Sequence, residues 1–362
     1  MMIKIEELIN KDWIIQDIGN DHVRISYNVK KGNNPKPFVF PRGIRINEFL
    51  SECIAMYLGD GKLSKDLHHS DFTNKDIDLI CKMLRFFKYL GVNENDMTFT
   101  IDYRSGNENE IVDNISKLIG THKFRINKTD RNKYPSVHVQ VNGKIFRIIL
   151  ERIIMKSLKI IKNTPLLRRA WLRGYFSAEG CVGYHSKENY LGHISFSYNP
   201  QKESWLRDYC ISILNKEGIR DKIRIRHEEH NGSIIITNWN NYYRLWKIGI
   251  FNGCERKRKK FEEIIKRVKI TCDMETVFRK NILSNINQYE LATLLGTYQA
   301  TISNIINKTD RNMWLTKNQI MTLCERKNIS IDDAKKSVIK IRFGNLTEMK
   351  MDKELIEDIF NL

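Results

Sequence analysis

The sequence lacks paired cysteines. None of its seven cysteines stands in a CxxC pair; they are Cys53, Cys81, Cys181, Cys210, Cys254, Cys272 and Cys324. A zinc ribbon needs such pairs, and a disulfide framework is typical of short secreted chains. Both are therefore excluded, and we expect reduced, mostly buried thiols in a reducing compartment.

Long apolar runs are also missing. The first residues, MMIKIEELINKDW, carry charge throughout, so they do not resemble a secretory signal. No stretch is long and apolar enough to cross a bilayer. We therefore expect no membrane partner and a cytoplasmic, nucleoid-associated location, with an organelle left open.

Acidic residues are few relative to basic ones. Lys and Arg number 61 against 43 Asp and Glu, which leaves a net charge of +18. Such an excess favours a polyanionic partner, most often nucleic acid, although a generally basic composition is the alternative. The 362 residues, 41% of them apolar, suffice for two or three domains with a sizeable core.

An internal duplication is present. Residues 47–61 read NEFLSECIAMYLGDG, and residues 164–180 read TPLLRRAWLRGYFSAEG. Each predicts a helix that ends in a carboxylate and a glycine, Asp60-Gly61 and Glu179-Gly180, and each glycine suits a left-handed helix end. Small residues recur four apart within each helix: Ala55 and Gly59, Gly174 and Ala178. Because such residues form a smooth strip on one helix face, we expect the two helices to pack closely, each presenting one carboxylate at its tip.

The segments after the two acids also correspond. Each predicts a strand, an amphipathic helix, further strands and a closing helix. The unit αββαββα therefore occurs twice, and the fold class is α+β with two pseudo-symmetric halves and antiparallel sheets.

The predicted strands alternate apolar and polar residues. Polar residues share one face in SVHVQVN, HISFSY and KIRIRH, and they are His138, Gln140, Asn142, His193, Ser195, Ser197, Arg224 and Arg226. Such side chains match the donors and acceptors of base edges in the DNA major groove. The alternative for any single strand is an ordinary half-exposed sheet.

Two motifs carry a family resemblance. LGDG at 58–61 and LRGYFSAEG at 172–180 resemble the paired LAGLIDADG motifs of monomeric homing endonucleases, over about residues 45–270. The first motif departs from the pattern in its early letters. The second keeps its glycine and alanine and has Glu179 where Asp is usual, a variation that the family tolerates.

The resemblance implies a function. It implies that the motif helices form the interface between the halves and that Asp60 and Glu179 bind Mg²⁺ over the scissile phosphates. It also implies water-organising residues after the next strand, where Asn74, Lys75 and Lys202 stand. Divalent cations assist phosphodiester hydrolysis, and carboxylates with phosphates and water suit Mg²⁺. The expected activity is cleavage of double-stranded DNA by a monomer, at a long asymmetric site, leaving short 3′ overhangs.

The flanking regions are less patterned. Residues 1–45 predict a small β-element or a DNA-contacting arm, and the run ERKRKK from residue 255 either grips phosphates or begins a solvated helix. Residues 287–312 resemble a helix-turn-helix of the phage-repressor kind. Its outward residues would be Gln299, Thr301, Ser303 and Asn304.

The predicted organisation is an extension (1–45), two halves (46–160 and 161–270), and a small all-α C-terminal domain with a tail (271–362). Two further functions stay open for this fold. One is a non-catalytic transcription regulator, although such proteins typically lose the acids. The other is a maturase that helps an intron RNA fold, so intron RNA remains a possible partner.

Overall fold

The computed structural model describes residues 1–27, 34–63, 68–121, 123–130, 134–185, 190–220, 222–227, 231–267, 269–300, 302–303, 314–343, 347–349 and 353–361. They form two compact units, and each is described here by itself. The first comprises Met1–Val182, Ile194–Ile236 and Tyr243–Phe261, and the second comprises Gly183–His193, Thr237–Tyr242 and Glu262–Leu362.

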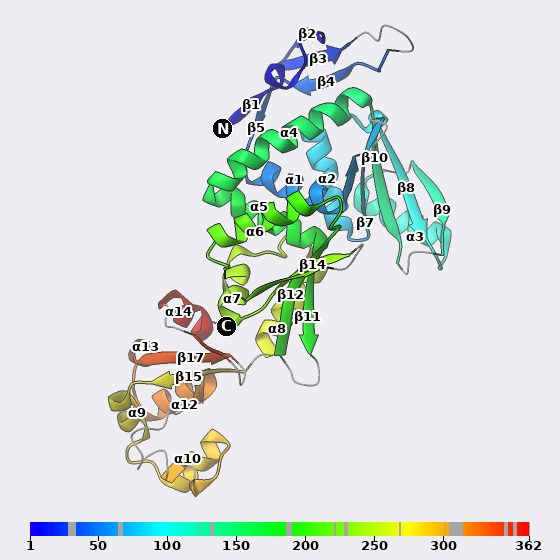
Figure 1. Ribbon diagram of the computed structural model, residues 1–362. Coiled ribbons are helices and arrows are strands. Elements are labelled where there is room, and N and C mark those ends of the chain that lie inside the picture. The colour runs from blue at the N-terminus through cyan, green and yellow to red at the C-terminus, as the bar shows by residue number, and fades with distance from the viewer. Residues whose placement is uncertain are drawn as a thin grey trace. The chain divides into compact units, whose positions relative to one another are not determined.

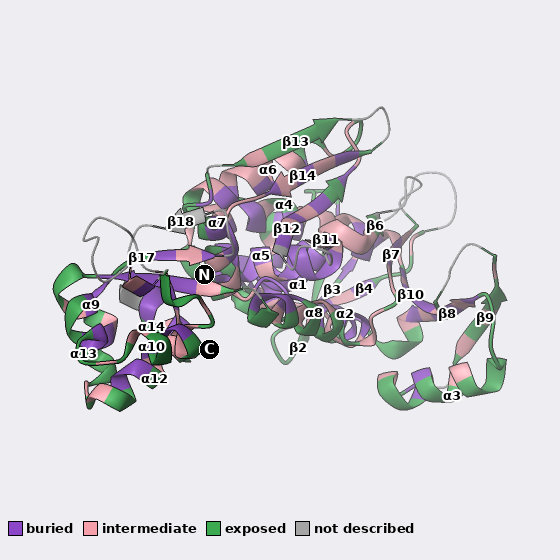
Figure 2. Ribbon diagram, turned by 90° about the horizontal axis from the view of Figure 1, so that it is seen from below, coloured by how far each residue is buried: buried purple, intermediate pink, exposed green. Residues whose placement is uncertain are grey.

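Two helices lie side by side at the centre of the first unit, α1 (Glu48–Asp60) and α5 (Pro165–Glu179) (Figure 1). Both are largely buried, although the start of α5 is exposed at Leu166 and Arg169 (Figure 2). The Asn47 side chain caps α1 by accepting from the Leu50 amide at 2.9 Å. Pro165 begins α5, and the Thr164 hydroxyl donates to the Ile160 carbonyl instead of capping the helix.

The expectation of a left-handed end to these helices is wrong. Gly61 and Gly180 are extended, with φ of −88° and −67°, because strands begin at these very residues. Glycine is favoured at both positions because there is no room for a β-carbon. A β-carbon would lie 2.3 Å from the Tyr57 carbonyl oxygen at Gly61 and 2.4 Å from the Phe176 carbonyl oxygen at Gly180. The chain therefore turns sharply out of each helix, directly after the acid.

The first half contains α1, a five-stranded sheet and three further helices. Its later elements are β6 (Gly61–Leu63), β7 (His69–Asn74), α2 (Ile77–Tyr89), η2 (Glu94–Asp96), β8 (Met97–Tyr103), α3 (Glu108–Ile119), β9 (Phe124–Lys128), β10 (Ser136–Asn142) and α4 (Lys144–Asn163). The strand order is β6-β7-β10-β8-β9. β8 and β9 are parallel, so the prediction of a purely antiparallel sheet is wrong at this edge. The reason is the inserted helix α3, which carries the chain back along the sheet and is largely exposed (Figure 2).

The second half repeats this order without the insertion. Its elements are α5, β11 (Gly180–His185), β12 (Tyr190–Tyr198), α6 (Ser204–Lys216), β13 (Ile223–His227), β14 (Gly232–Ile236) and α7 (Trp239–Ile248), followed by α8 (Glu255–Arg267). Its sheet has the order β11-β12-β14-β13. With α3 and β9 set aside, both halves read αββαββα, which confirms the predicted α+β fold class.

Residues before α1 form a small β-element. It contains β1 (Met2–Lys4), η1 (Ile5–Leu8), β2 (Ile14–Gly19), β3 (His22–Ser26), β4 (Phe38–Pro41) and β5 (Gly43–Arg45). Arg152 of α4 holds it by donating to the Leu8 carbonyl and the Asn10 side chain, with its guanidinium 5.5 Å from the Trp13 ring. The element is thus packed on the first half.

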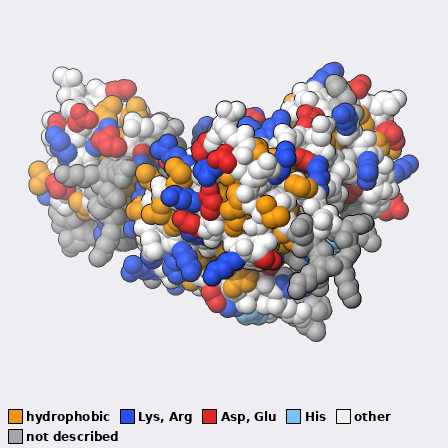
Figure 3. Space-filling view, turned by 90° about the horizontal axis from the view of Figure 1, so that it is seen from above, with side chains coloured by type: hydrophobic (Ala, Val, Ile, Leu, Met, Phe, Trp, Pro, Cys, Tyr) orange, Lys and Arg blue, Asp and Glu red, His pale blue; other side chains and the backbone are white. Residues whose placement is uncertain are grey.

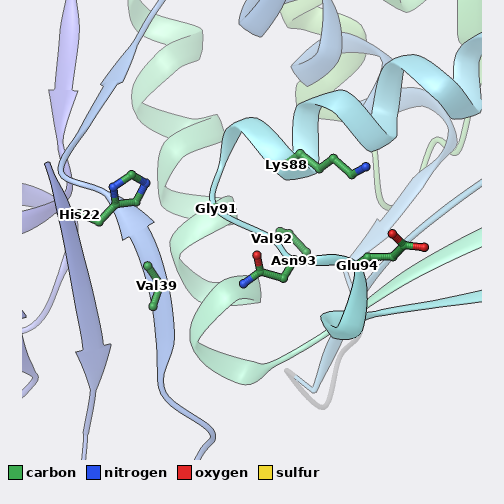
Figure 4. Close-up of a pocket in the computed structure, with 7 residues that line it drawn as sticks. All are labelled: His22, Val39, Lys88, Gly91, Val92, Asn93 and Glu94. Carbon is green, nitrogen blue, oxygen red and sulfur yellow. The ribbon is translucent and has the colours of Figure 1, made fainter. Parts of the chain in front are cut away.

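A polar pocket marks the seam between this element and α2. It is lined by His22, Val39, Lys88, Gly91, Val92, Asn93 and Glu94 (Figure 4). His22 lies on the side of β3, and Lys88 and Glu94 extend on the other side of the Gly91 turn (Figure 4). Gly91 has φ +90°, and a β-carbon on it would lie 2.5 Å from the Val39 carbonyl oxygen. The pocket therefore marks a close contact between two backbone segments. The functional groups that line it do not point toward a common centre.

The second unit combines a sheet with helices. Its elements beyond α8 are β15 (Ile270–Met274), α9 (Thr276–Leu283), α10 (Gln288–Leu295), β16 (Leu315–Thr316), α12 (Lys317–Lys327), α13 (Ile331–Lys336), β17 (Val338–Phe343), β18 (Thr347–Met349) and α14 (Lys353–Asn361). The sheet order is β16-β15-β17-β18. The prediction of an all-α C-terminal domain is therefore wrong. The central pair, β15 and β17, joins segments more than sixty residues apart, and local patterning does not reveal such a pairing.

The cysteines are free thiols and mostly buried, with Cys181 exposed. Within the described ranges, no helix combines the length and the apolar character needed to span a bilayer.

Candidate active site

Two carboxylates lie at the adjoining tips of α1 and α5. Asp60 and Glu179 are the last residues of these helices, and a β-carbon on Gly59 would lie 3.0 Å from Glu179 Cγ. Burial raises the pKa of Asp60 to about 6. Burial and then the charge of Asp60 raise the pKa of Glu179 to about 7. The two carboxylates therefore interact electrostatically in a partly desolvated site. Such an arrangement is common in functional sites.

Asn74 orients the first acid. It ends β7, and its Nδ2 donates to Asp60 Oδ2 at 2.6 Å. Its own Oδ1 accepts from the Asp76 amide at 2.8 Å, which fixes the direction of the side-chain amide. Asn74 was predicted to organise water or contact DNA, and the structure brings it to the acid pair.

Lys257 of α8 brings a positive charge to the acid pair. Its ammonium donates to the carbonyl of Ala178, the residue before Glu179. The charge of Lys257 lowers the pKa of both Asp60 and Glu179 and so opposes the effect of burial. A cation at a helix C-terminus also compensates the helix dipole. Lys257 is thus a residue of the site. From the sequence, the basic run that contains it was predicted either to bind phosphates or to begin a solvated helix.

The start of α8 is held against the start of α2. Arg256 forms two hydrogen bonds with Asp76, from Nε to Oδ1 and from Nη2 to Oδ2, both 2.8 Å. The Glu255 amide donates to Asp78 Oδ2 at 2.7 Å. Because α2 belongs to the first half and Ala178 to the second, α8 links the two halves at the acid pair.

The two lysines predicted from the family pattern lie elsewhere. The Lys75 ammonium is 5.4 Å from the centre of the Tyr134 ring. Lys202 precedes α6, and its amide donates to Asn199 Oδ1 at 3.2 Å. In the part of the chain that the structure describes, neither lysine forms a hydrogen bond or ion pair with Asp60 or Glu179. Their assignment as catalytic residues stays a prediction.

The polar face of the first sheet carries a network of side chains. Thr73 Oγ1 lies 2.7 Å from His138 Nδ1, and His138 Nε2 lies 2.7 Å from Asp102 Oδ2. Asp102 Oδ1 accepts from Asn127 at 3.0 Å, so the network crosses β7, β10, β8 and β9. Further along β10, Gln140 is half-buried and Asn142 donates to Thr98. The predicted DNA-reading residues of β10 thus lie on one face and are held by their neighbours.

The second sheet presents a basic polar face. Arg224 and Arg226 are exposed on β13 and pair opposite Ile235 and Ser233 of β14. The same two β14 residues pair with Ser195 and Ser197 of β12, so the serines share this face. His193 lies further back on β12, where its ring occupies the space that a β-carbon on Gly183 would need.

The predicted helix-turn-helix is described in part. Helix α10 has Leu291 and Ala292 buried and ends at Gly296, whose φ is +62°. Beyond the turn, Ile302 is buried, Gln299 is exposed and Ser303 is half-buried. Thr301 and Asn304 lie outside the described residues.

The acid pair fits a divalent metal. Carboxylate oxygens are hard donors, and Mg²⁺ commonly takes one or two of them together with phosphates and water. Across the described residues, no group of three or more His, Cys, Asp and Glu forms an all-protein cage. Asp60 and Glu179 would thus be the residues that hold the ion.

On one face of the molecule, the described basic side chains do not gather into a separate patch. On the face shown in Figure 3, Lys and Arg side chains are interspersed with acidic and apolar ones. The alternation of polar and apolar residues along the strands therefore indicates more specifically than charge where a polyanion could bind.

Comparisons with known proteins find one matching family model and several similar solved structures. Residues 167–296 match the family model described as a LAGLIDADG-like domain. The chain is similar to a structure of the homing endonuclease I-DmoI in complex with DNA and Ca, at 14% identity over 60% of this chain and 97% of that chain, with a TM-score of 0.33. For the homing endonuclease I-WcaI bound to its DNA recognition sequence, the identity is 17% over 59% and 88%, with a TM-score of 0.36.

A third similar structure is full-length DUF199/WhiA from Thermatoga maritima, at 12% identity over 80% of this chain and 89% of that chain, with a TM-score of 0.37. No curated protein matches the chain. The family match includes most of α5 with Glu179 and all of β11 to β14. Residues 167–296 therefore form a LAGLIDADG-like domain, which includes the second of the two motifs.

Proposed function

We propose that this protein is a site-specific endonuclease that cuts double-stranded DNA with the help of a divalent metal, as Mg²⁺ would provide. One observation carries the proposal: Asp60 and Glu179, one from each half, meet at the tips of two closely packed helices. Because each half supplies one acid, the two acids correspond to the two strands of a duplex, each of which has to be cut. Because both acids belong to one chain, a monomer suffices.

The chain's own groups prepare this site. Asp60 and Glu179 offer oxygen ligands, and Asn74 holds Asp60 in one orientation. A bound divalent ion would polarise the scissile phosphate, activate water and stabilise the leaving oxygen. The tight packing of α1 against α5 fixes the spacing of the acids. Such preorganisation favours a transition state of fixed geometry.

The DNA is proposed to lie along the polar faces of the two sheets. Arg224 and Arg226 can each read guanine in the major groove, while Gln140 and Asn142 offer amide groups suited to adenine. The helix-turn-helix at α10 would add a second contact and lengthen the recognised site. Base contacts of this kind would supply the specificity, and the net charge of +18 would supply affinity for phosphates.

The test begins with DNA recovered by repeated binding selection from a random double-stranded library, because the target is unknown. Recovered sites are cloned into a plasmid and incubated with the full chain and Mg²⁺. We expect cleavage by the wild type, and at least a thousandfold loss of rate in Asp60→Asn and Glu179→Gln with DNA affinity largely kept. Asp113→Asn and Glu325→Gln, which change exposed acids, are the matched controls.

Two results would contradict the proposal. Full cleavage by the double variant Asp60→Asn/Glu179→Gln would show that the acid pair is not the catalytic site. Tight and selective binding without any cleavage by the wild type, in Mg²⁺ or Mn²⁺, would instead identify a DNA-binding protein that does not cut.

A further inference from the structure

The first half contains an insertion within its sheet. Between β8 and β10 the chain runs through residues 104–135, which hold α3 and β9. Between β13 and β14, the equivalent strands of the second half, it runs through residues 228–231, which are too few for a helix and a strand. The first sheet therefore ends in an extra strand, β9, next to β8 (Figure 1). The sequence duplication does not account for this strand.

The inserted strand continues the polar face of the first sheet. Thr73, His138 and Thr100 are paired across β7, β10 and β8, and Arg125 of β9 pairs with Thr100. Paired residues of neighbouring strands point to the same face of a sheet. Arg125 is thus the last member of a row of polar side chains on the face where DNA is proposed to lie, and it is exposed.

The opposite face of β9 is covered. The centre of the Phe124 ring lies 5.9 Å from that of the buried Phe99 ring. Helix α3 packs against α2, which itself packs against β7 and β10. Both helices therefore lie on the apolar side of the sheet, and the side chain of Arg125 is left open to solvent on the other side.

Asn127 of the inserted strand contacts an acid of the polar face. Its Nδ2 donates to Asp102 Oδ1 at 3.0 Å, and Asp102 Oδ2 lies 2.7 Å from His138 Nε2. Both carboxylate oxygens thus have a partner, and the Asp102 side chain is only 15% exposed. An open carboxylate here would repel phosphates. The contact with β9 therefore keeps this face suited to a polyanion.

The two sheets carry their arginines on different strands. In the second sheet the last strand is β13, on which Arg224 and Arg226 are exposed on the polar face. Its counterpart in the order of the first sheet is β8, which has Thr100 and Asp102 on that face. The arginine of the first sheet is Arg125, on the next strand. It therefore stands about 4.8 Å further from the strand that follows the acid.

We propose that β9 is an additional DNA-contacting strand and that Arg125 makes its contact with the duplex, so that the recognised site extends further on the flank bound by the first half. One strand spacing of about 4.8 Å corresponds to about one to two base pairs, because B-DNA rises about 3.4 Å per pair. The inference rests on the proposed function in one respect, namely that the polar sheet faces bind DNA.

The experiment is hydroxyl-radical footprinting of the full chain on a site recovered by the binding selection, with a binding titration in parallel. Both are done in EDTA, so that the DNA stays intact. The variants are Arg125→Gln and, for the second sheet, Arg224→Gln. Lys128→Gln is the matched control, because Lys128 is also an exposed cation of β9 but pairs with Tyr103 and so belongs to the opposite face.

The two arginine variants should act on different flanks of the site. Arg125→Gln should lose protection of about one to two base pairs at the outer end of one flank, and Arg224→Gln should lose protection on the other flank. Arg125→Gln should also weaken binding by about five- to tenfold. Lys128→Gln should keep the footprint and stay within about twofold of the wild-type affinity. All three should melt with the wild type, because the changed side chains are exposed.

The outcomes separate this inference from the proposed function. An unchanged footprint and affinity in Arg125→Gln, or equal losses in Lys128→Gln, would overturn the role of β9 and leave the proposed function intact. Losses on the same flank in Arg125→Gln and Arg224→Gln would overturn it too, because the two sheets would then not bind separate flanks. A wild type that protects no defined site would instead refute DNA recognition by the sheets, and with it both proposals.

Discussion

Gly174 of α5 lies directly against the carbonyl group of Glu52 on α1. A β-carbon on Gly174 would stand 2.0 Å from the carbonyl oxygen and 3.0 Å from the β-carbon of Ala55. One turn further along, a β-carbon on Gly59 would lie 2.9 Å from that of Ala178. The two motif helices are thus in backbone contact, and this contact sets the distance between the acids that follow.

Substitution of these glycines tests the contact. Gly174→Ala should reduce the free energy of unfolding by about 2–3 kcal/mol, because the new methyl group meets backbone that cannot move aside. Gly59→Ala should cost less, about 1 kcal/mol, because its neighbours are side-chain atoms of Ala178 and Glu179. Urea denaturation of both variants measures the difference. Equal losses, or a larger loss for Gly59→Ala, would contradict the described packing.

The acid pair should make stability depend on pH. The folded protein raises the pKa of Asp60 to about 6, so its carboxyl holds the proton more tightly when folded than when unfolded. Its contribution to stability is therefore fully present below about pH 4, the range of an unperturbed Asp, and is lost as the pH rises through 6. In EDTA, Asp60→Asn should be more stable than the wild type by about 1–2 kcal/mol at pH 8 and nearly equal to it at pH 4.

Urea denaturation in EDTA at these two pH values measures that change. Asp113→Asn, an exposed acid on α3, is the control and should show no such crossover. An Asp60→Asn variant that is less stable at pH 8 would show that the ionised carboxylate stabilises the fold.

Two arginines should read bases two pairs apart. Arg224 and Arg226 alternate on β13, so their Cα atoms are about 6.6 Å apart, which is about two steps of B-DNA. The recovered sites should therefore contain two guanines separated by one base pair. Arg224→Gln should lose preference at one of them by about tenfold, and Arg226→Gln at the other.

Binding selection with each variant measures these preferences. Arg267→Gln, which removes the same charge from an exposed position of α8, should weaken binding to all sequences alike. A uniform loss for Arg224→Gln as well would place that arginine on phosphates.

Removal of residues 271–362 should weaken DNA binding and keep the fold of the first unit. The truncation also removes Phe343, whose ring stacks on Trp239 with centroids 4.6 Å apart. A cooperative melt a few degrees below that of the full chain is therefore expected. Phe343→Ala distinguishes the loss of this ring stacking from the loss of DNA contacts. It should lower the melting temperature and leave the DNA affinity nearly intact. Loss of the cooperative transition on truncation would show that the first unit requires the C-terminal region.

Much of the fold follows from local pattern. The two motif helices, the strands of both sheets and the helix ending at Gly296 follow from apolar periodicity and from small residues, each acting within a few positions. The pairing of Asp60 with Glu179 follows as well, because duplicated helices that pack through small residues bring equivalent ends together. The presence of Asn74 at the site could also be predicted, because Asn74 stands at the end of the strand that follows the first acid.

Contacts between distant segments required the tertiary structure. The sheet of the second unit pairs residues 270–274 with 338–343, and the cation beside Glu179 comes from residue 257. The sequence by itself determined the fold class and the acid pair, because periodicity and duplication are local properties of the chain. Only the tertiary structure decided which lysine lies beside the acids. In a chain with 61 basic residues, composition leaves many candidates, and only the docking of α8 on Asp76 and Asp78 selects Lys257.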